Sequence, residues 1–287
     1  MSTLTPRVAL ESALITHGFA YPRNAQVARE MAQAVRECEA QPCIIAVLGG
    51  QVKIGLDDGE IETLARANDV RKCSTRDLGI VIGMGLDGGT TVAATMFLAA
   101  KHGIGVFATG GIGGVHRGHP FDVSADLIEL SRTPVTVVCA GAKALLDLPL
   151  TFEHLETLGV PVIGYQTDEI PAFYTRRSGL RADVRAETPQ DVARIVRTRR
   201  ALGLPGGELV CAPLPREAEL SREVAEEAIV EAQRRADEAG IRGPAATPFM
   251  LDQIAKLTGG ASVRANVALL INNARIAAHI ARAMMDE

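Results

Sequence analysis

Short runs of apolar and β-branched residues alternate with stretches of helical periodicity, and this alternation restricts the fold more than any other feature of the sequence. Runs of four to eight residues that end in Gly or a polar residue are typical of strands buried on both faces. We expect such strands at residues 43–48, 79–82, 105–109, 134–139, 160–165 and 208–212. Strands that alternate with helices predict an α/β fold in which helices cover the sheet.

Helix-boundary signals lie between these runs. Gly103 follows an apolar helical stretch, as glycine often does one residue past a helix end. Thr188 followed by Pro189 is typical of a helix start, with the proline in the first turn. Asn24 is predicted to cap the first long helix, because its side chain can accept a hydrogen bond from a free backbone amide.

The chain from residue 216 onward is helical in pattern. We expect helices over 216–239, from 247 to about 259, and over 261–285. No linker sets this tail apart, so it is predicted to pack on the α/β body in a single domain spanning 1–287. A chain of 287 residues, 47% of them hydrophobic, can bury a core of that size.

Composition excludes several classes of protein. The net charge of −4, an aromatic content of 3% and the absence of Trp argue against a nucleic-acid-binding surface. No apolar stretch approaches the roughly 20 residues of a membrane span, and residues 1–13 lack the pattern of a signal peptide. The five cysteines are scattered and are predicted to be buried, reduced thiols. We therefore expect a cytoplasmic protein that binds neither nucleic acid nor membrane.

Residues 83–88 match the pattern GxGxxG between a predicted strand and a predicted helix. A dinucleotide-binding fold places an acidic residue about 20 positions further on. No Asp or Glu occurs between Asp87 and Asp122, so NAD binding is not expected. A glycine turn before Thr90 would still expose the amides of a helix N-terminus, which favours a phosphate or another anion.

The segment 109–118, TGGIGGVHRG, is the densest candidate for a binding loop. Four glycines in six residues let the backbone approach a ligand closely, and the segment follows a predicted strand. Ligands of α/β sheets bind at the carboxyl ends of strands. A purely structural glycine turn is the alternative, although Thr109, His116 and Arg117 add chemistry that such a turn does not need.

Asp122, Ser124 and Asp126 follow this loop directly. Ser124 can cap a helix with Asp126 in its first turn, and capping alone would explain both residues. Capping does not explain Asp122. Hard divalent cations such as Mg²⁺ or Mn²⁺ take carboxylate and water oxygens, so a cation is an alternative use of this cluster.

Lys143 and Glu11 are candidate reacting groups. Lys143 lies among small apolar residues just past a predicted strand, and an amine of lowered pKa attacks carbon. An ordinary solvated lysine is the alternative. Glu11 lies beside apolar residues and could be a buried acid of raised pKa, although a surface or capping glutamate would have the same sequence.

Taken in order, these motifs resemble one family, the pseudouridine-5′-phosphate glycosidases, also described as indigoidine synthase A-like. The resemblance extends from about residue 7 to the end of the chain, and TGGIGGVHRG together with the CAGAK segment makes it specific. The matching segments are 9–12, 16–24, 88–96, 109–118, 121–130, 138–148, 155–174, 247–260 and 265–278.

The resemblance implies a role for each candidate residue. Lys143 matches the family's nucleophile, which forms a covalent adduct with ribose C1′, and Glu11 matches its general acid/base. Asp122 matches the residue that holds Mn²⁺, largely through water. The positions that match substrate-binding residues are Lys72, Val92, Thr109, His116, Ser124, Ala125, Asp126 and Asn266.

The resemblance also implies an architecture and an assembly. It implies an α/β/α sandwich with a mostly parallel central sheet, a small flap subdomain around 175–205 and a homotrimer. The implied ligands are pseudouridine 5′-phosphate, uracil and ribose 5-phosphate.

The implied reaction fits the residue types. A carbon–carbon glycoside offers no heteroatom leaving group, so the reaction requires an amine nucleophile and a carboxyl that carries a proton. Two other functions remain open from the residues alone. One is another lysine-dependent lyase or aldolase acting on a phosphosugar, and the other is a sugar-phosphate binder without catalysis.

Overall fold

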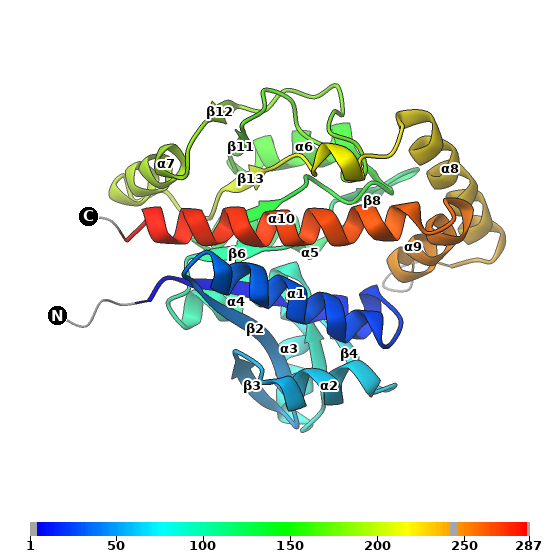
Figure 1. Ribbon diagram of the computed structural model, residues 1–287, viewed down its shortest axis with the longest axis horizontal. Helices are drawn as coiled ribbons and strands as arrows, with labels where there is room; N and C mark the ends of the chain where they lie inside the picture. Colours follow the sequence, from blue (N-terminus) through cyan, green and yellow to red (C-terminus); the bar gives the residue numbers. More distant parts are fainter. Residues whose placement is uncertain (1–4, 242–245, 286–287) are drawn as a thin grey trace.

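A large, mostly parallel sheet runs through the centre of the protein (Figure 1). The computed structural model describes residues 5–241 and 246–285. Among these residues the sheet has ten strands, with β3 paired to β2 beside the main order β12-β11-β13-β9-β6-β1-β2-β5-β4. Its strands are β1 (Arg7–Glu11), β2 (Gln41–Leu48), β3 (Gln51–Ile54), β4 (Arg71–Cys73), β5 (Gly88–Thr90), β6 (Val106–Ala108), β9 (Thr136–Cys139), β11 (Val162–Tyr165), β12 (Val184–Ala186) and β13 (Leu209–Cys211).

Strand direction fixes where the loops gather. Strand β1 is parallel to β2 and β6, and β6 is parallel to β9, while β2 is antiparallel to β3 and β5. The carboxyl ends of β1, β6 and β9 therefore lie at one edge of the sheet. Apart from Arg7, the residues of these strands are buried, as a sheet covered on both faces requires.

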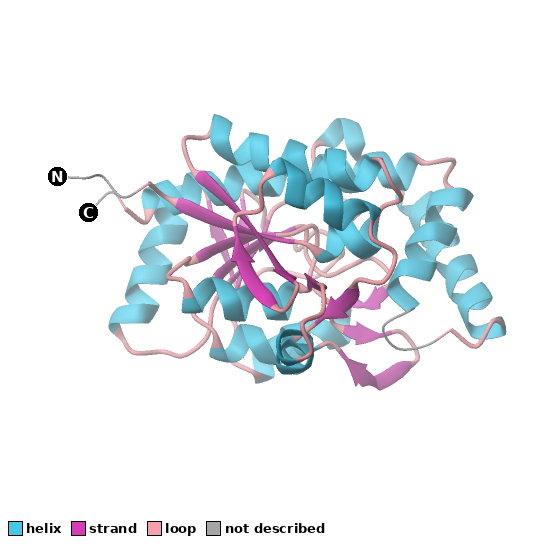
Figure 2. Cartoon of the chain, turned by 90° about the horizontal axis from the view of Figure 1, so that it is seen from below, coloured by secondary structure: helices cyan, strands magenta, loops and turns pink. Residues whose placement is uncertain are grey.

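Helices cover both faces of this sheet (Figure 2). Helices α1 and α7 each pack on α10, and α10 contacts β1, β6 and β9. Helix α4 packs on β1, β2 and β6, beside α3 and α5. The helices are α1 (Arg23–Glu37), α2 (Asp58–Arg66), α3 (Thr75–Gly83), α4 (Val92–Lys101), α5 (Ala125–Arg132), α6 (Leu148–Thr157), α7 (Pro189–Ala201), α8 (Arg222–Glu238), α9 (Ala246–Leu257) and α10 (Ala261–Ala283), with a π-turn at Leu14–Gly18 and a 3₁₀ turn at Arg216–Ala218. The predicted α/β/α sandwich is confirmed.

A second, smaller sheet lies beside the strand ends. It is antiparallel and contains β10 (Leu146–Asp147), β7 (Val115–His116) and β8 (His119–Val123), in that order. Helices α8 and α9 pack on each other at the same end of the molecule (Figure 1). Strands β7 and β8, at the end of the glycine-rich loop, form an antiparallel hairpin.

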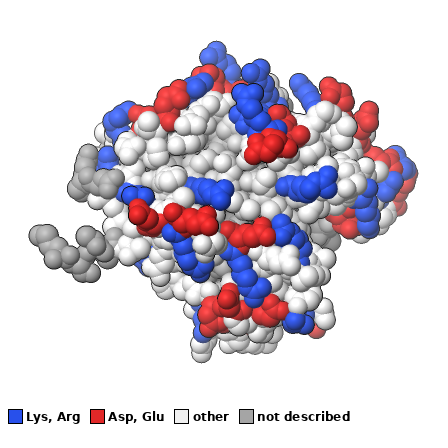
Figure 3. All heavy atoms as spheres, in the orientation of Figure 1, with Lys and Arg blue, Asp and Glu red and all other residues white. Residues whose placement is uncertain are grey.

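The outer surface over α1 and α10 carries charges of both signs, interspersed (Figure 3). Arg275 and Arg282 on α10 form ion pairs with Glu37 and Glu39 at the end of α1. Within the described residues no single helix is long and apolar enough to cross a membrane, and α9 with α10 meets that test only as a pair bent by 119°. All five cysteines are buried thiols, as predicted.

Two local predictions were wrong. Residues 79–82 were expected to form a strand but lie in α3, because Ser74 and Asp77 form a capping box that starts a helix. The glycine turn at 83–88 therefore follows a helix and leads into β5. Asn24 does not cap α1, since it lies inside the helix and donates from its side-chain amide to the Ile15 and Ala65 carbonyls.

Other boundary predictions were confirmed. Thr188 accepts the Asp191 amide at the start of α7, with Pro189 in the first turn. The segment 175–205, expected to contain a flap, includes strand β12, which pairs in parallel with β11, and helix α7, which packs on α10. Its movement as a flap stays a prediction.

Candidate active site

Three neighbouring strands deliver candidate reacting groups to the same edge of the sheet. Glu11 is the last residue of β1, Thr109 follows β6, and Lys143 lies four residues after the end of β9. Because these strands are adjacent and parallel, their carboxyl ends bring the three side chains together. Residues that are 98 and 132 positions apart from Glu11 in sequence thereby share one site.

Glu11 is a buried carboxyl with an identified donor. Its side chain is 8% exposed, and the Thr109 hydroxyl donates a hydrogen bond to Oε1. Burial raises the pKa of Glu11 above its ordinary value, while the cation of Lys143 and the Thr109 hydrogen bond act to lower it. Of the two alternatives left open for Glu11, the structure shows the buried carboxyl and not the surface or capping glutamate. A carboxyl of raised pKa is suited to carrying a proton.

Lys143 is held through its main chain. Its amide donates to the Ile112 carbonyl at 3.0 Å, and the Ile112 amide donates to the Gly141 carbonyl at 3.1 Å. Gly141 has φ of +83°, and a Cβ atom there would lie 2.3 Å from the Pro171 carbonyl oxygen, so only glycine fits. The half-buried Lys143 is therefore fastened to the glycine-rich segment, and its side chain influences the pKa of both Glu11 and Lys72.

Asp126 ties two backbone segments together. Its Oδ1 accepts the Ala93 amide of the first turn of α4 at 3.0 Å, and its Oδ2 accepts the Gly113 amide at 2.7 Å. Ser124 caps α5 by accepting the Asp126 amide, as predicted. The predicted binding positions Val92, Ser124 and Ala125 lie directly beside these contacts, at the N-termini of α4 and α5.

Lys72 in β4 adds a second cation. Burial and the charge of Lys143 lower the pKa of Lys72, while the carboxylates of Asp126 and Glu11 raise it. Two lysines and two carboxylates therefore act on one another within this site. Such a mixture of charges can bind an anionic group and also hold protons on more than one side chain.

His116 and Asp122 lie on the small antiparallel sheet. Burial lowers the pKa of the half-buried His116 imidazole, whereas the carboxylate of Asp122 raises it. Asp122 is exposed on β8, and both residues line a cavity of about 430 Å³ that Asp237 and Met250 border from α8 and α9. This cavity opens beside the glycine-rich loop.

The metal-binding capacity of Asp122 is limited. Hard cations require several oxygen ligands, and within 5–241 and 246–285 no three His, Cys, Asp or Glu side chains are grouped to hold an ion. Asp122 supplies one exposed carboxylate. The donor set fits only a cation that keeps most of its ligands as water.

Helix α10 supports the site from one side. Asn266 lies against the glycine-rich loop, since a Cβ on Gly110 would be 3.4 Å from its Oδ1. Asn273, fully buried, donates to the Thr109 carbonyl at 2.8 Å, and its Oδ1 has no hydrogen-bond partner among the described residues. Asn273 was not predicted, although it lies in a segment that carries the family resemblance.

His17 was also not predicted. The pKa of its ring is lowered by burial and by the charge of Lys72, and its Nδ1 lies 2.6 Å from the Thr16 hydroxyl. The π-turn Leu14–Gly18 places it one turn beyond Glu11. The sequence signal was the segment 16–24, which carries part of the family resemblance but was assigned no role.

Comparison with known proteins identifies relatives over the whole length. The family model described as "Indigoidine synthase A like protein" matches residues 1–283. A protein of Caldanaerobacter subterraneus named pseudouridine-5′-phosphate glycosidase is 54% identical, covering 96% of this chain and 91% of its own. A protein of the same name from Chloroflexus aurantiacus is 55% identical, and the match covers 96% of this chain and 92% of that protein.

Two solved structures share the fold. The prealnumycin C-glycosynthase AlnA in complex with ribulose 5-phosphate has a TM-score of 0.89 and 38% identity, covering 98% of this chain and 92% of its own. An indigoidine synthase A-like protein from Thermotoga maritima has a TM-score of 0.92 and 34% identity, covering 98% and 94%. The second structure carries the same family description as the sequence match.

Proposed function

This chain belongs to the indigoidine synthase A-like family, and from that membership we propose that it is a pseudouridine-5′-phosphate glycosidase. It makes and breaks the carbon–carbon bond between uracil and ribose 5-phosphate. The observation that carries the proposal is the buried Glu11 carboxyl beside Lys143 at one edge of the sheet. Relatives at 54% and 55% identity that have this name support the choice of substrate.

The chemistry starts from the nature of the bond. Uracil C5 is joined to ribose C1′ without a heteroatom, so the two-carboxylate scheme of ordinary glycosidases does not apply. Ring opening comes first, with an acid protonating the ring oxygen. The opened sugar conjugates C1′ with the uracil ring, which makes C1′ electrophilic.

Lys143 then forms the covalent intermediate. Its neutral amine adds to C1′, a proton reaches uracil C5, and the C1′–C5 bond breaks with its electron pair leaving on uracil. The lysine remains joined to ribose 5-phosphate as an imine, and water hydrolyses that imine to the free sugar. Each step conserves electrons, so no oxidant or reductant is required.

Glu11 carries the proton between these steps. It protonates the ring oxygen and takes a proton from the attacking amine, and its raised pKa suits both directions of transfer. The Thr109 hydroxyl orients the carboxyl through its hydrogen bond. Because Glu11 is buried, the transfer takes place where water competes least.

The remaining site residues bind the substrate. The phosphate lies against Lys72, Thr109 and the amides at the start of α4 near Val92, where a helix N-terminus favours an anion. Its binding energy, far from the reacting bond, holds the opened sugar in place. The positions next to the base and sugar are His116, Ser124, Ala125, Asp126 and Asn266.

Asp122 is proposed to hold a Mn²⁺ ion, largely through water. The ion would supply positive charge near the substrate. Calorimetric titration of Mn²⁺ into wild-type protein and Asp122→Asn checks this directly. Binding of equal strength to both proteins would remove Asp122 from the metal site.

Association into a homotrimer is proposed on the family likeness. Exposed apolar side chains gather along α3 and the glycine turn, which gives a surface that association would cover. They are Ile80, Ile82, Met84 and Leu86. A mass measured by light scattering that equals a single chain would contradict the trimer.

One assay tests the reaction class and the nucleophile together. Purified protein is mixed with uracil, ribose 5-phosphate and Mn²⁺, and pseudouridine 5′-phosphate is sought by mass spectrometry and ultraviolet absorbance. Lys143→Ala should abolish turnover in both directions, whereas Lys101→Ala, at the far end of α4, should leave it unchanged.

The outcome separates the alternatives. Turnover of a phosphosugar without any need for uracil would indicate a different lysine lyase or aldolase. Ribose 5-phosphate that binds but is never trapped on Lys143 by borohydride would indicate a binding protein. Carbon–carbon cleavage that persists in Lys143→Ala would exclude the lysine mechanism.

A further inference from the structure

Arg117 links the small sheet to the loop that carries Lys143. It follows β7, and its Nε donates to the Leu146 carbonyl at 3.1 Å while Nη2 donates to the Ala144 carbonyl at 3.2 Å. Its Nη1 pairs with the Glu226 carboxylate of α8 at 2.7 Å. One guanidinium therefore joins three segments of the chain.

The two carbonyls lie immediately after the nucleophile in sequence. The Lys143 main chain is held by the hydrogen bond from its amide to the Ile112 carbonyl. Leu146 pairs with His116 through β10 and β7, but Ala144 lies between Lys143 and that strand. A side-chain hydrogen bond from Arg117 reaches the Ala144 carbonyl.

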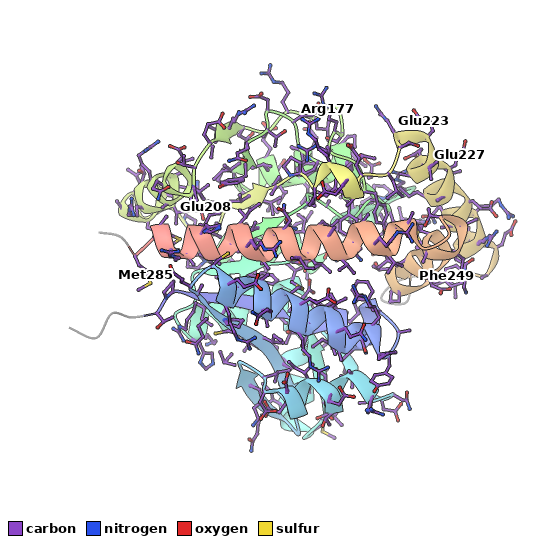
Figure 4. All side chains as sticks on the ribbon, in the orientation of Figure 1. Arg177, Glu208, Glu223, Glu227, Phe249 and Met285 are labelled. Atoms are coloured by element: carbon purple, nitrogen blue, oxygen red, sulfur yellow. The ribbon has the colours of Figure 1, made fainter. Side chains whose placement is uncertain are left out.

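The outer side of this loop borders open space. A cavity of about 640 Å³ is lined by Ala144 and Leu146, with Arg177 across from α8 (Figure 4). Ala144 and Leu146 are themselves almost fully buried, so both packing and hydrogen bonds restrain the loop. Packing alone does not fix the direction of the two carbonyls, whereas the rigid fork of an arginine can bind both in a fixed geometry.

We propose that Arg117 is a positioning residue that sets the place of Lys143 relative to the sugar carbon. The inference rests on the proposed function, in which Lys143 is the nucleophile. Glu226 balances the charge of Arg117, so the effect on Lys143 is geometric. A displacement of about 1 Å in a reacting group can cost on the order of 10²-fold in rate.

The test separates rate from binding. Arg117→Ala is expected to lower kcat by about 10²-fold while KM for ribose 5-phosphate changes by less than about threefold, because the phosphate contacts are elsewhere. Arg117→Lys keeps the charge but not the fork, so its kcat should lie between those of wild type and Arg117→Ala. Glu226→Gln keeps both carbonyl contacts and should lower kcat by less than about threefold.

Free guanidinium provides a readout that a folding defect would not give. Millimolar guanidinium can enter the open cavity and occupy the vacated position, so it should raise kcat of Arg117→Ala and leave wild type unchanged. Arg234→Lys, an exposed ion-paired arginine of α8, is the matched control and should behave as wild type.

Borohydride trapping distinguishes failure of this inference from failure of the proposed function. If wild type forms no adduct with ribose 5-phosphate on Lys143, the proposed function fails first. If wild type is trapped and Arg117→Ala is trapped equally fast with unchanged kcat, the positioning role is refuted. The positioning role would also be refuted if Arg117→Ala and Arg117→Lys both lower kcat and the thermal midpoint to the same extent as each other and guanidinium does not raise kcat of Arg117→Ala.

Discussion

Replacing Thr109 with Val removes the hydroxyl that donates to Glu11 while keeping the shape of the side chain. The hydrogen bond lowers the pKa of Glu11 against the larger effect of burial, so its loss should raise that pKa further. A hydrogen bond to a charged group is worth about 1.5–3 kcal/mol, and 1.36 kcal/mol corresponds to one pKa unit. The expected shift is therefore about one to two units upward.

The assay is the pH dependence of kcat at saturating ribose 5-phosphate, which removes any effect of Thr109 on phosphate binding. The acid limb, which in the proposed mechanism reports Glu11 accepting a proton from Lys143, should move to higher pH by about one to two units. Thr133→Val is the matched control, because the Thr133 hydroxyl donates to the buried Glu129 away from the site. An acid limb that stays in place in folded Thr109→Val would refute the reasoning.

The same variant changes stability with a definite sign. Glu11 has a raised pKa in the folded protein, so the unfolded chain loses its proton first as the pH rises above 4.5. Its contribution to stability is complete below that pH and is lost as the pH rises through the folded pKa. In Thr109→Val the loss should continue to higher pH, which urea unfolding at several pH values would show.

Three other predictions concern residues around the site. Gly113→Ala should lower both kcat and the thermal midpoint, since its Cβ would lie 2.3 Å from Ser124 Oγ and overpacking costs about 1–3 kcal/mol. Asn273→Leu leaves the Thr109 carbonyl without its donor, and should lower the free energy of unfolding by about 1–3 kcal/mol in urea titrations. Wild-type stability should rise with pH between the lowered pKa of Lys72 and 10.5, because the unfolded chain binds more protons there, and this rise should vanish in Lys72→Met.

Local signals made part of the fold predictable. Thr188 with Pro189 marks the start of α7, because capping involves only neighbouring residues. Residues 79–82 were mispredicted because a run of four apolar residues fits a strand or a helix equally well. The capping box formed by Ser74 and Asp77, itself a local signal, makes this run part of a helix.

The residues alone left Glu11 and Lys143 open between reacting groups and ordinary surface side chains, and the family resemblance selected them as candidates. The order of the parallel strands brings the two residues to one edge of the sheet. The supporting contacts could not be read from the sequence. Arg117 acts through carbonyls 27 and 29 positions away, and Asn273 through one 164 positions away, so only the folded chain reveals them.

Helix α10 has a consequence for how the protein is made. It packs on β1, β6 and β9 and supplies Asn273, which fastens the loop that begins at Thr109. A ribosome adds Asn273 164 positions after Thr109. The strands that deliver Glu11 and Lys143 are therefore translated long before their support exists, and a nascent chain acquires the finished site only after α10 has emerged and docked.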